Sequence, residues 1–156
     1  MGKEPPAEKA LATNRKAFFN YEVLDRLEAG ISLVGTEVKS IREGGLHFRD
    51  AYVELRGGEL FLVGCRIGPY SHGNQLNHPE DRVRKLLLHK QEILKVGGKA
   101  TEKGYTIIPL RAYLKNGRVK VEIGLARGKR AYDKRETLKR KDLERETRQA
   151  MRTRRD

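Results

Sequence analysis

The stretch Y-T-I-I-P-L-R-A-Y-L-K-N-G-R-V-K-V-E-I-G-L-A-R, residues 105–127, contains the clearest structural signal in the chain. Its central pair, Asn116-Gly117, is the dipeptide that most strongly favours a two-residue β-hairpin turn. After the turn, apolar and polar residues alternate, as they do in a strand with one buried face. The stretch therefore predicts two long antiparallel strands, Tyr105–Leu114 and Arg118–Arg127.

Upstream of this hairpin, the alternation of apolar and polar residues predicts further strands. A second hairpin is expected around the turn residues Gly57-Gly58. Glu28-Ala29-Gly30 is typical of a turn, and Leu46–Asp50 has room for one helical turn. The predicted strands are Phe18–Leu27, Ile31–Arg42 with a bend at Gly35, Tyr52–Leu55 and Leu60–Val63.

The segment between the two hairpins starts with a long polar loop, Ile67–Asp81, and then allows two interpretations. In the first, Pro79–Val96 is one helix that starts with Pro and two acidic residues. In the second, Lys85–Leu88 is a buried strand, and a helix begins after His89 with Glu92 at the capping-box position. Three consecutive leucines and the spacing of Glu92 favour the second interpretation.

Three strands, a helix and two strands follow one another in the order of an oligonucleotide-binding (OB) fold. We therefore predict a mainly β protein with short helices, whose core is an OB-fold-like closed antiparallel β-barrel. The barrel is expected to cover residues 14–127, between a flexible leader, 1–13, and a basic C-terminal tail, 128–156.

The net charge of +13 and the sequence pI of about 10.0 favour a polyanionic partner. Lys and Arg side chains that contact phosphates release counterions, which favours binding to nucleic acids. Cys65 is the single cysteine, so no disulfide forms within the chain and a cytoplasmic location is expected. No apolar run approaches the roughly 18 residues that a membrane helix needs.

The tail is rich in charged residues: residues 128–156 contain twelve Lys or Arg and six Asp or Glu. Its few apolar residues do not recur every three or four positions, so no stripe is available to pack on the barrel. Glu136 with Arg140, and Glu144 with Arg148, are helix-supporting pairs, but such pairs are too weak to order a free chain. We predict a tail that is disordered when free and helical along phosphates.

Four motifs resemble those of the small protein B family, the SsrA-binding proteins of bacterial trans-translation. The motifs are G-T-E-V-K-S (35–40), R-K-L-L-L-H-K (84–90), G-L-A-R-G-K-R (124–130) and D-K-R (133–135). They occur in the family's order, and the similarity covers about residues 13–140. The resemblance implies a barrel that holds the tRNA-like domain of transfer-messenger RNA (tmRNA, or SsrA).

The same resemblance implies how such a protein acts in ribosome rescue and peptide tagging. Its tail is expected to enter the small-subunit decoding region and the mRNA channel of stalled ribosomes, where it replaces the codon–anticodon stem. Elongation factor Tu is expected to join through the RNA. We expect a monomeric RNA-binding protein that is not an enzyme and that needs no cofactor and no metal.

Matching the family motifs residue by residue gives a set of expected contacts. Tyr132 stands where some relatives have His, which argues against proton transfer there but keeps a ring that can stack on a base. The expected RNA-binding residues are Asn14, Arg15, Lys16, Glu28, Lys39, Arg84, Lys85, Leu87 and His89. The expected ribosome-binding residues of the tail are Gly128, Lys129, Arg130, Tyr132, Asp133, Lys134 and Arg135.

Other functions compete with this one. A ribosomal or general RNA-binding protein with a basic arm would have the same charge. A metal-dependent nuclease would use Glu37 and Lys39 on one strand, with Asp25 on the strand before, to hold Mg²⁺ and the nucleophile. A zinc site is rejected because His72, His78 and His89 lack the usual ligand spacing.

Overall fold

The computed structural model describes residues 9–72, 77–102, 104–129, 143 and 145–148. The strands of its main sheet are β1 (Lys9–Thr13), β2 (Tyr21–Ile31), β4 (Tyr52–Arg56), β5 (Glu59–Val63), β7 (Arg84–Leu87), β8 (Tyr105–Lys115) and β9 (Arg118–Gly128). Their order is β1-β8-β4-β5-β7-β2-β9, and β9 pairs again with β8. This last pairing closes β8, β4, β5, β7, β2 and β9 into an antiparallel ring, which we call the β ring.

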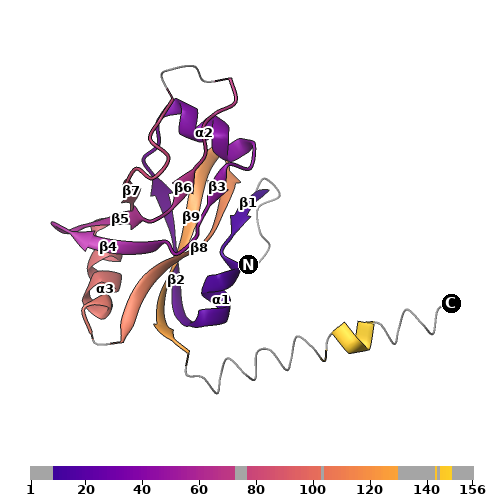
Figure 1. The fold of residues 1–156 in the computed structure, drawn as a ribbon. Helices are drawn as coiled ribbons and strands as arrows, with labels where there is room; N and C mark the ends of the chain where they lie inside the picture. Colours follow the sequence, from indigo (N-terminus) through magenta and orange to yellow (C-terminus); the bar gives the residue numbers. More distant parts are fainter. Residues whose placement is uncertain (1–8, 73–76, 103, 130–142, 144, 149–156) are drawn as a thin grey trace.

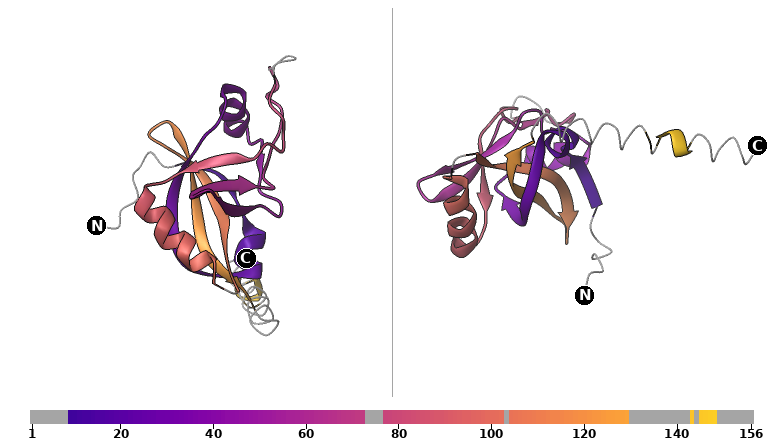
Figure 2. Two further views of the ribbon diagram at one scale, coloured as in Figure 1. Left: turned by 90° about the vertical axis from the view of Figure 1, so that its left-hand side faces the viewer. Right: turned by 90° about the horizontal axis from the view of Figure 1, so that it is seen from below.

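In the part of the chain that the structure describes, the short helices α1 (Arg15–Asn20), α2 (Gly35–Arg42) and α3 (Lys90–Ala100) lie around the β ring. Figure 1 shows α1 and α2 towards opposite ends of the ring and α3 along its side, and the views in Figure 2 agree. A two-stranded sheet of β3 (Leu46–His47) and β6 (Arg66–Ile67) lies beside α2. The prediction of a mainly β protein with short helices is confirmed.

The hairpin predicted from Asn116-Gly117 is confirmed. β8 and β9 pair from Tyr105 opposite Arg127 to Lys115 opposite Arg118. Asn116 and Gly117 have φ angles of 52° and 75°, and a type I′ turn requires positive φ at both central residues. The alternating apolar side chains of β9 fill the core of the ring, as expected: Val119, Val121, Ile123 and Leu125.

The hairpin of β4 and β5 is also confirmed, as is the second of the two interpretations for the segment after the polar loop. β7 ends at Leu87, and α3 begins directly after His89. The backbone N–H of His89 donates to Oε1 of Glu92 at 2.9 Å, which is half of a capping box.

The predicted strand Ile31–Arg42 is wrong beyond its first residue, because residues 35–42 form helix α2. Glu37 accepts a hydrogen bond from the backbone N–H of Val34 at 3.0 Å, and this contact starts the helix. Glu37, Ser40 and Ile41 are buried together, at the helical spacing of three and four residues. Buried and exposed residues in this segment therefore do not alternate one by one, as they would in a half-buried strand.

The predicted strand Phe18–Leu27 is correct only from Tyr21 onward, since residues 15–20 form helix α1. The turn predicted at Glu28–Gly30 is also wrong, because β2 continues to Ile31. Ala29 has no exposed surface and pairs with Val121 of β9, so this stretch is held inside the sheet. Because β2 pairs with β7 on one side and with β9 on the other, the strand continues through Glu28–Gly30 in spite of the turn-forming residues there.

Two further segments differ from the predictions. Residues 9–13, assigned to a flexible leader, form strand β1 along the edge of β8. Leu46–Asp50 is not a helical turn: Leu46 and His47 pair with β6, and a tight turn follows in which the N–H of Ala51 donates to the carbonyl of Phe48. In the tail, the described residues 143 and 145–148 are helical; the prediction of disorder for the rest falls outside the described residues.

Candidate nucleic-acid interface

Three predicted RNA-binding residues from separate parts of the sequence line one hollow on the surface of the β ring. Glu28 comes from β2, Leu87 ends β7, and His89 directly precedes α3. The hollow has a volume of about 500 Å³ and is completed by Gly30, Leu88, Glu92 and Lys120. We call it the Glu28 hollow.

Strand register explains why these residues meet. Gly30 pairs with Leu87 on one side and with Lys120 on the other, so β7, β2 and β9 lie side by side here. A Cβ atom at Gly30 would lie 3.2 Å from the Cβ of Leu87, so the absence of a side chain lets Leu87 approach closely. Glu28 is two residues before Gly30 and therefore on the same face of the sheet.

Leu87 gives the Glu28 hollow an apolar wall. The residue is 51% exposed, whereas its neighbour Leu86 is 1% exposed and belongs to the core. Adjacent residues of a strand point to opposite faces, so the alternation places Leu87 outward. An exposed leucine beside ionic groups offers an apolar contact to a base or a sugar.

Glu28 is an anionic acceptor held among cations. The phenol of Tyr113 donates to Oε2 of Glu28, and Nζ of Lys115 lies 3.3 Å from each carboxylate oxygen. Partial burial raises the pKa of Glu28, but the hydrogen bonds from Tyr113 and Lys115 outweigh it and hold the pKa below the ordinary 4.5. Glu28 is therefore ionised at neutral pH and accepts hydrogen bonds without donating any.

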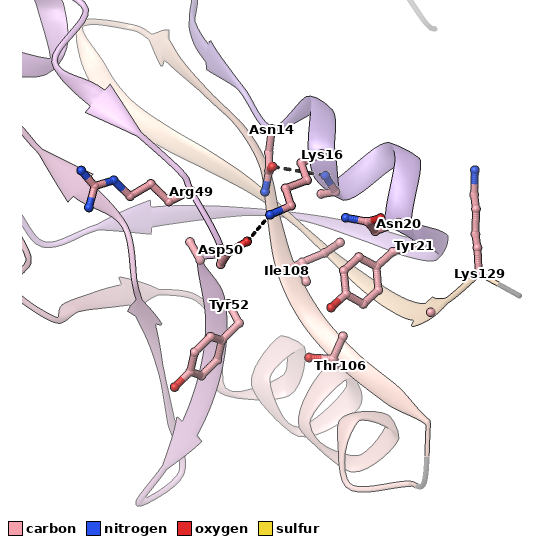
Figure 3. Close-up of a pocket in the computed structure, with 13 residues that line it drawn as sticks. Asn14, Lys16, Asn20, Tyr21, Arg49, Asp50, Tyr52, Thr106, Ile108 and Lys129 are labelled. Atoms are coloured by element: carbon pink, nitrogen blue, oxygen red, sulfur yellow. Dashed lines mark hydrogen bonds and ion pairs between the residues drawn. The ribbon is translucent and has the colours of Figure 1, made fainter. Parts of the chain in front are cut away.

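A second hollow, of about 630 Å³, lies where α1, β4, the start of β8 and the end of β9 meet. We call it the Lys16 hollow. Figure 3 shows Lys16 reaching from α1 towards Asp50, with which it forms an ion pair. The hollow contains cations, aromatic rings and hydrogen-bonding groups, among them Lys16, Tyr21, Arg49, Tyr52, Thr106 and Lys129.

The N-terminal trio of predicted RNA-binding residues divides into two kinds. Arg15 and Lys16 are exposed on α1. Asn14 is only 7% exposed: its Nδ2 donates to the carbonyl of Pro109 at 2.8 Å, and its Oδ1 accepts from the N–H of Ala17. Asn14 therefore caps α1 and ties it to β8, which fixes the position of Lys16.

Arg84, which the motif comparison assigns to RNA, lies inside the protein. Its side chain has no exposed surface, and Nε donates to Oε2 of Glu37. Nη1 and Nη2 donate to the carbonyls of Cys65 and Glu80 at 3.0 and 2.9 Å. A phosphate cannot reach this guanidinium, so the assignment of Arg84 to direct RNA contact is corrected to a structural role.

The same ion pair contradicts the nuclease hypothesis. Glu37 lies on a helix and not on a strand, its side chain has no exposed surface, and its carboxylate is bound by Arg82 and Arg84. Asp25 lies on β2, where its carboxylate is 3.7 Å from Nζ of Lys95. The described residues contain no cluster of three His, Cys, Asp or Glu that could hold a metal ion.

The remaining predicted residues are dispersed. Lys39 is exposed on α2, with its ammonium 5.5 Å from the ring centre of Tyr70. Lys85 lies on β7 and pairs with Glu59 at 2.9 Å. Gly128 ends β9, and the N–H of Lys129 donates to the carbonyl of Asn20 at 2.9 Å. The other predicted tail residues lie outside the described residues: Arg130, Tyr132, Asp133, Lys134 and Arg135.

The motif comparison did not indicate Lys120 or the aromatic residues of the Lys16 hollow. The alternation of β9 places Lys120 outward, but only the pairing of β2 with β9 brings it next to Gly30. Tyr52 is 44% exposed on β4, and no short motif marks it. Among the described residues, no helix has the length and apolar character needed to cross a membrane.

Comparisons with known proteins all indicate the same protein family. The family model described as SmpB protein matches residues 11–153. The SsrA-binding protein of Geobacter sulfurreducens is 53% identical over 145 residues, covering 93% of this chain and 95% of that protein. The SsrA-binding protein of Latilactobacillus sakei is 51% identical over 156 residues, covering 99% of this chain and 100% of that protein.

A solved structure supports the same relationship. A chain from "tmRNA-SmpB: a journey to the center of the bacterial ribosome" has a TM-score of 0.66 and 46% sequence identity. The match covers 77% of this chain and 85% of that chain. By sequence over almost its whole length, and by fold, the chain belongs to the SmpB family.

Proposed function

We propose that this protein binds the tRNA-like domain of tmRNA and accompanies it to stalled ribosomes in trans-translation. It acts as a non-enzymatic RNA adaptor in the cytoplasm, as a monomer, with elongation factor Tu joining through the RNA. The closed antiparallel ring supports an OB-type barrel as its RNA-holding body. The names of its relatives, SsrA-binding proteins, support the same partner.

The observation that carries this proposal is the convergence of Glu28, Leu87 and His89 on one hollow. Folded RNAs are recognised largely at loops, where unstacked bases present hydrogen-bonding edges and flat faces. The Glu28 hollow offers a carboxylate acceptor, an apolar wall and, in Lys120, a cation for the backbone. A carboxylate among phosphates is unfavourable unless it accepts from base amino groups, so it favours a defined RNA over any polyanion.

The tail completes the proposal. Residues from Lys129 onward are proposed to enter the small-subunit decoding region and the mRNA channel, where they take the place of the codon–anticodon stem. The density of Lys and Arg in residues 128–156 supports contact with ribosomal RNA. The Lys16 hollow, which ends at Lys129, is proposed as the point where the RNA-holding body meets the tail.

The proposal is tested by equilibrium binding of the isolated tRNA-like domain in the presence of excess tRNA. We expect selective binding that weakens by about tenfold or more in Glu28→Ala and in His89→Ala, while circular dichroism stays unchanged. Glu54→Ala is the matched control, since Glu54 is an acid on β4 that pairs with Arg56 away from the hollow. Equal competition by tRNA would favour a general RNA-binding protein with a basic arm.

Deleting residues 128–156 separates the two proposed roles. The shortened protein should keep its affinity for the tRNA-like domain within a few-fold and should lose peptide tagging on stalled ribosomes. The triple variant Asp133→Ala, Lys134→Ala and Arg135→Ala should behave in the same way. Loss of RNA binding on truncation would contradict this division of roles.

A further inference from the structure

We propose that Tyr113 is a positioning residue for RNA recognition: its phenol holds the Glu28 carboxylate in the orientation that meets the RNA. This inference rests on the proposed function, because it concerns the same hollow. Tyr113 is not among the motif residues, and it does not line the Glu28 hollow itself. Tyr113 is only 2% exposed and its phenol donates to Glu28, so its effect on RNA is proposed to act through Glu28.

The contact between the two residues crosses an entire strand. Tyr113 pairs with Lys120, and Glu28 pairs with Glu122, so β9 lies between β8 and β2. The phenol of Tyr113 nevertheless donates to Oε2 of Glu28. A tyrosine is long enough to span this diagonal across an intervening strand, whereas a serine or threonine on β8 is not.

The tyrosine ring is fixed in place. Strand alternation puts Tyr113 on the same face of β8 as Arg111 and Lys115, which is the outer face of the ring. Only 2% of Tyr113 is exposed even so, and the guanidinium of Arg111 lies 4.6 Å from the ring centre. Nε of Arg111 is also 3.6 Å from a carboxylate oxygen of Glu122 on β9. Because the Tyr113 ring is held in this way, its hydroxyl has a defined position beside the Glu28 carboxylate.

Fixing Glu28 matters because the residue lies at the surface. A free glutamate side chain samples several rotamers and loses that freedom when it binds a base. Tyr113 and Lys115 restrict Glu28 before the RNA arrives, and Oε2 takes the phenol hydrogen bond. Further acceptor positions remain on the carboxylate for amino groups of the RNA, since each oxygen can accept two hydrogen bonds.

The test is Tyr113→Phe, which keeps the ring and removes the donor. Affinity for the tRNA-like domain should fall about three- to tenfold, the range for one lost hydrogen bond. In a Glu28→Ala background, which removes the acceptor of this hydrogen bond, the same substitution should have almost no further effect. Tyr105→Phe, at the other end of β8, is the matched control and should bind as the unmodified protein does. A full additional loss in the Glu28→Ala background would overturn the proposal, because Tyr113 would then act elsewhere.

A second measurement does not involve RNA. The carboxyl carbon of Glu28 can be followed by NMR as the pH is lowered. This signal separates Glu28 from the ionisable groups near it, which include Tyr113, Lys115, Lys120, His89, Glu92 and its pairing partner Glu122 on β9. Tyr113→Phe should move the Glu28 midpoint to higher pH, since it loses a donor to the ionised form. An unchanged midpoint would refute the positioning role and leave the proposed function standing. Absence of selective RNA binding by the unmodified protein would refute the proposed function instead.

Discussion

Nε of Arg84 donates to Oε2 of Glu37 at a distance of 2.5 Å, and neither side chain has exposed surface. This pair joins α2 to β7, and the two Nη atoms of Arg84 extend the connection to backbone carbonyls. Arg82 binds the other oxygen of Glu37. The motifs that contain Glu37 and Arg84 therefore hold α2 and the polar loop on the β ring.

Glu37→Gln should destabilise the fold strongly. The substitution leaves Arg84 buried without a counter-charge, and breaking a buried ion pair in this way costs about 3–5 kcal/mol. Urea unfolding followed by circular dichroism measures the change. Glu54→Gln, which breaks an exposed ion pair with Arg56, should unfold like the unmodified protein.

The same carboxylate should make stability depend on pH. Burial raises the pKa of Glu37, but hydrogen bonds from Arg82, from the Val34 N–H and from Arg84 outweigh it, so the pKa lies below the ordinary 4.5. A lowered folded-state pKa stabilises fully above the unfolded value, and this stability is lost as the pH falls through the folded value. Urea midpoints should fall from pH 5 towards pH 3 and fall less in Glu37→Gln. Parallel pH curves for the two proteins would contradict this assignment.

Leu86 and Leu87 should separate stability from function. Leu86→Ala removes a core side chain and should cost about 2–5 kcal/mol of unfolding free energy. Leu87→Ala, at a half-exposed position, should change stability by less than about 0.5 kcal/mol. It should still weaken binding of the tRNA-like domain by about three- to tenfold, because it removes the apolar wall. Unfolding and RNA titration on the two variants would be enough to check this.

How far the sequence predicts this fold depends on how local the deciding interactions are. Asn116-Gly117 and Gly57-Gly58 determine their turns within a few residues, and both hairpins are confirmed. Glu92 caps α3 in the same local way. Glu37 makes the same kind of local contact with the N–H of Val34, but valine is not a preferred N-cap residue, so the sequence does not mark the start of α2. The burial of Glu37 depends on Arg84, which is 47 positions away. The apolar residues in Ile31–Arg42 fit both the spacing of a strand and that of a helix. Only the contact of Glu37 with Arg84 decides in favour of the helix.

The candidate site could likewise be predicted only where local sequence patterns or family motifs mark its residues. A family resemblance identifies Glu28, Leu87 and His89, but their meeting depends on Gly30 pairing with β7 and β9 together. Arg84 is the opposite case: it belongs to a family motif, but its side chain is buried and stabilises the fold through Glu37. Tyr113 was not predicted as a site residue, because its contact with Glu28 crosses a strand that no local pattern indicates.

The two adjacent glycines of α3 should respond differently to alanine. A Cβ at Gly98 meets no atom within 4 Å, so Gly98→Ala should gain about 0.5–1 kcal/mol from helix propensity. A Cβ at Gly97 would lie 3.2 Å from Cδ2 of Leu55, so crowding offsets the same gain. Thermal unfolding should therefore rank Gly98→Ala above Gly97→Ala. The reverse order would show that α3 packs on β4 differently.

The most direct test of the account is to replace Leu87 by a photo-crosslinking amino acid and to irradiate the complex with tmRNA. Leu55, an exposed leucine on β4, takes the same crosslinker as the control. Sequencing of the crosslinked RNA should place the adduct from position 87 in the tRNA-like domain, with little or none from position 55. Strong crosslinks from position 55 and none from position 87 would contradict the Glu28 hollow as the RNA-binding site.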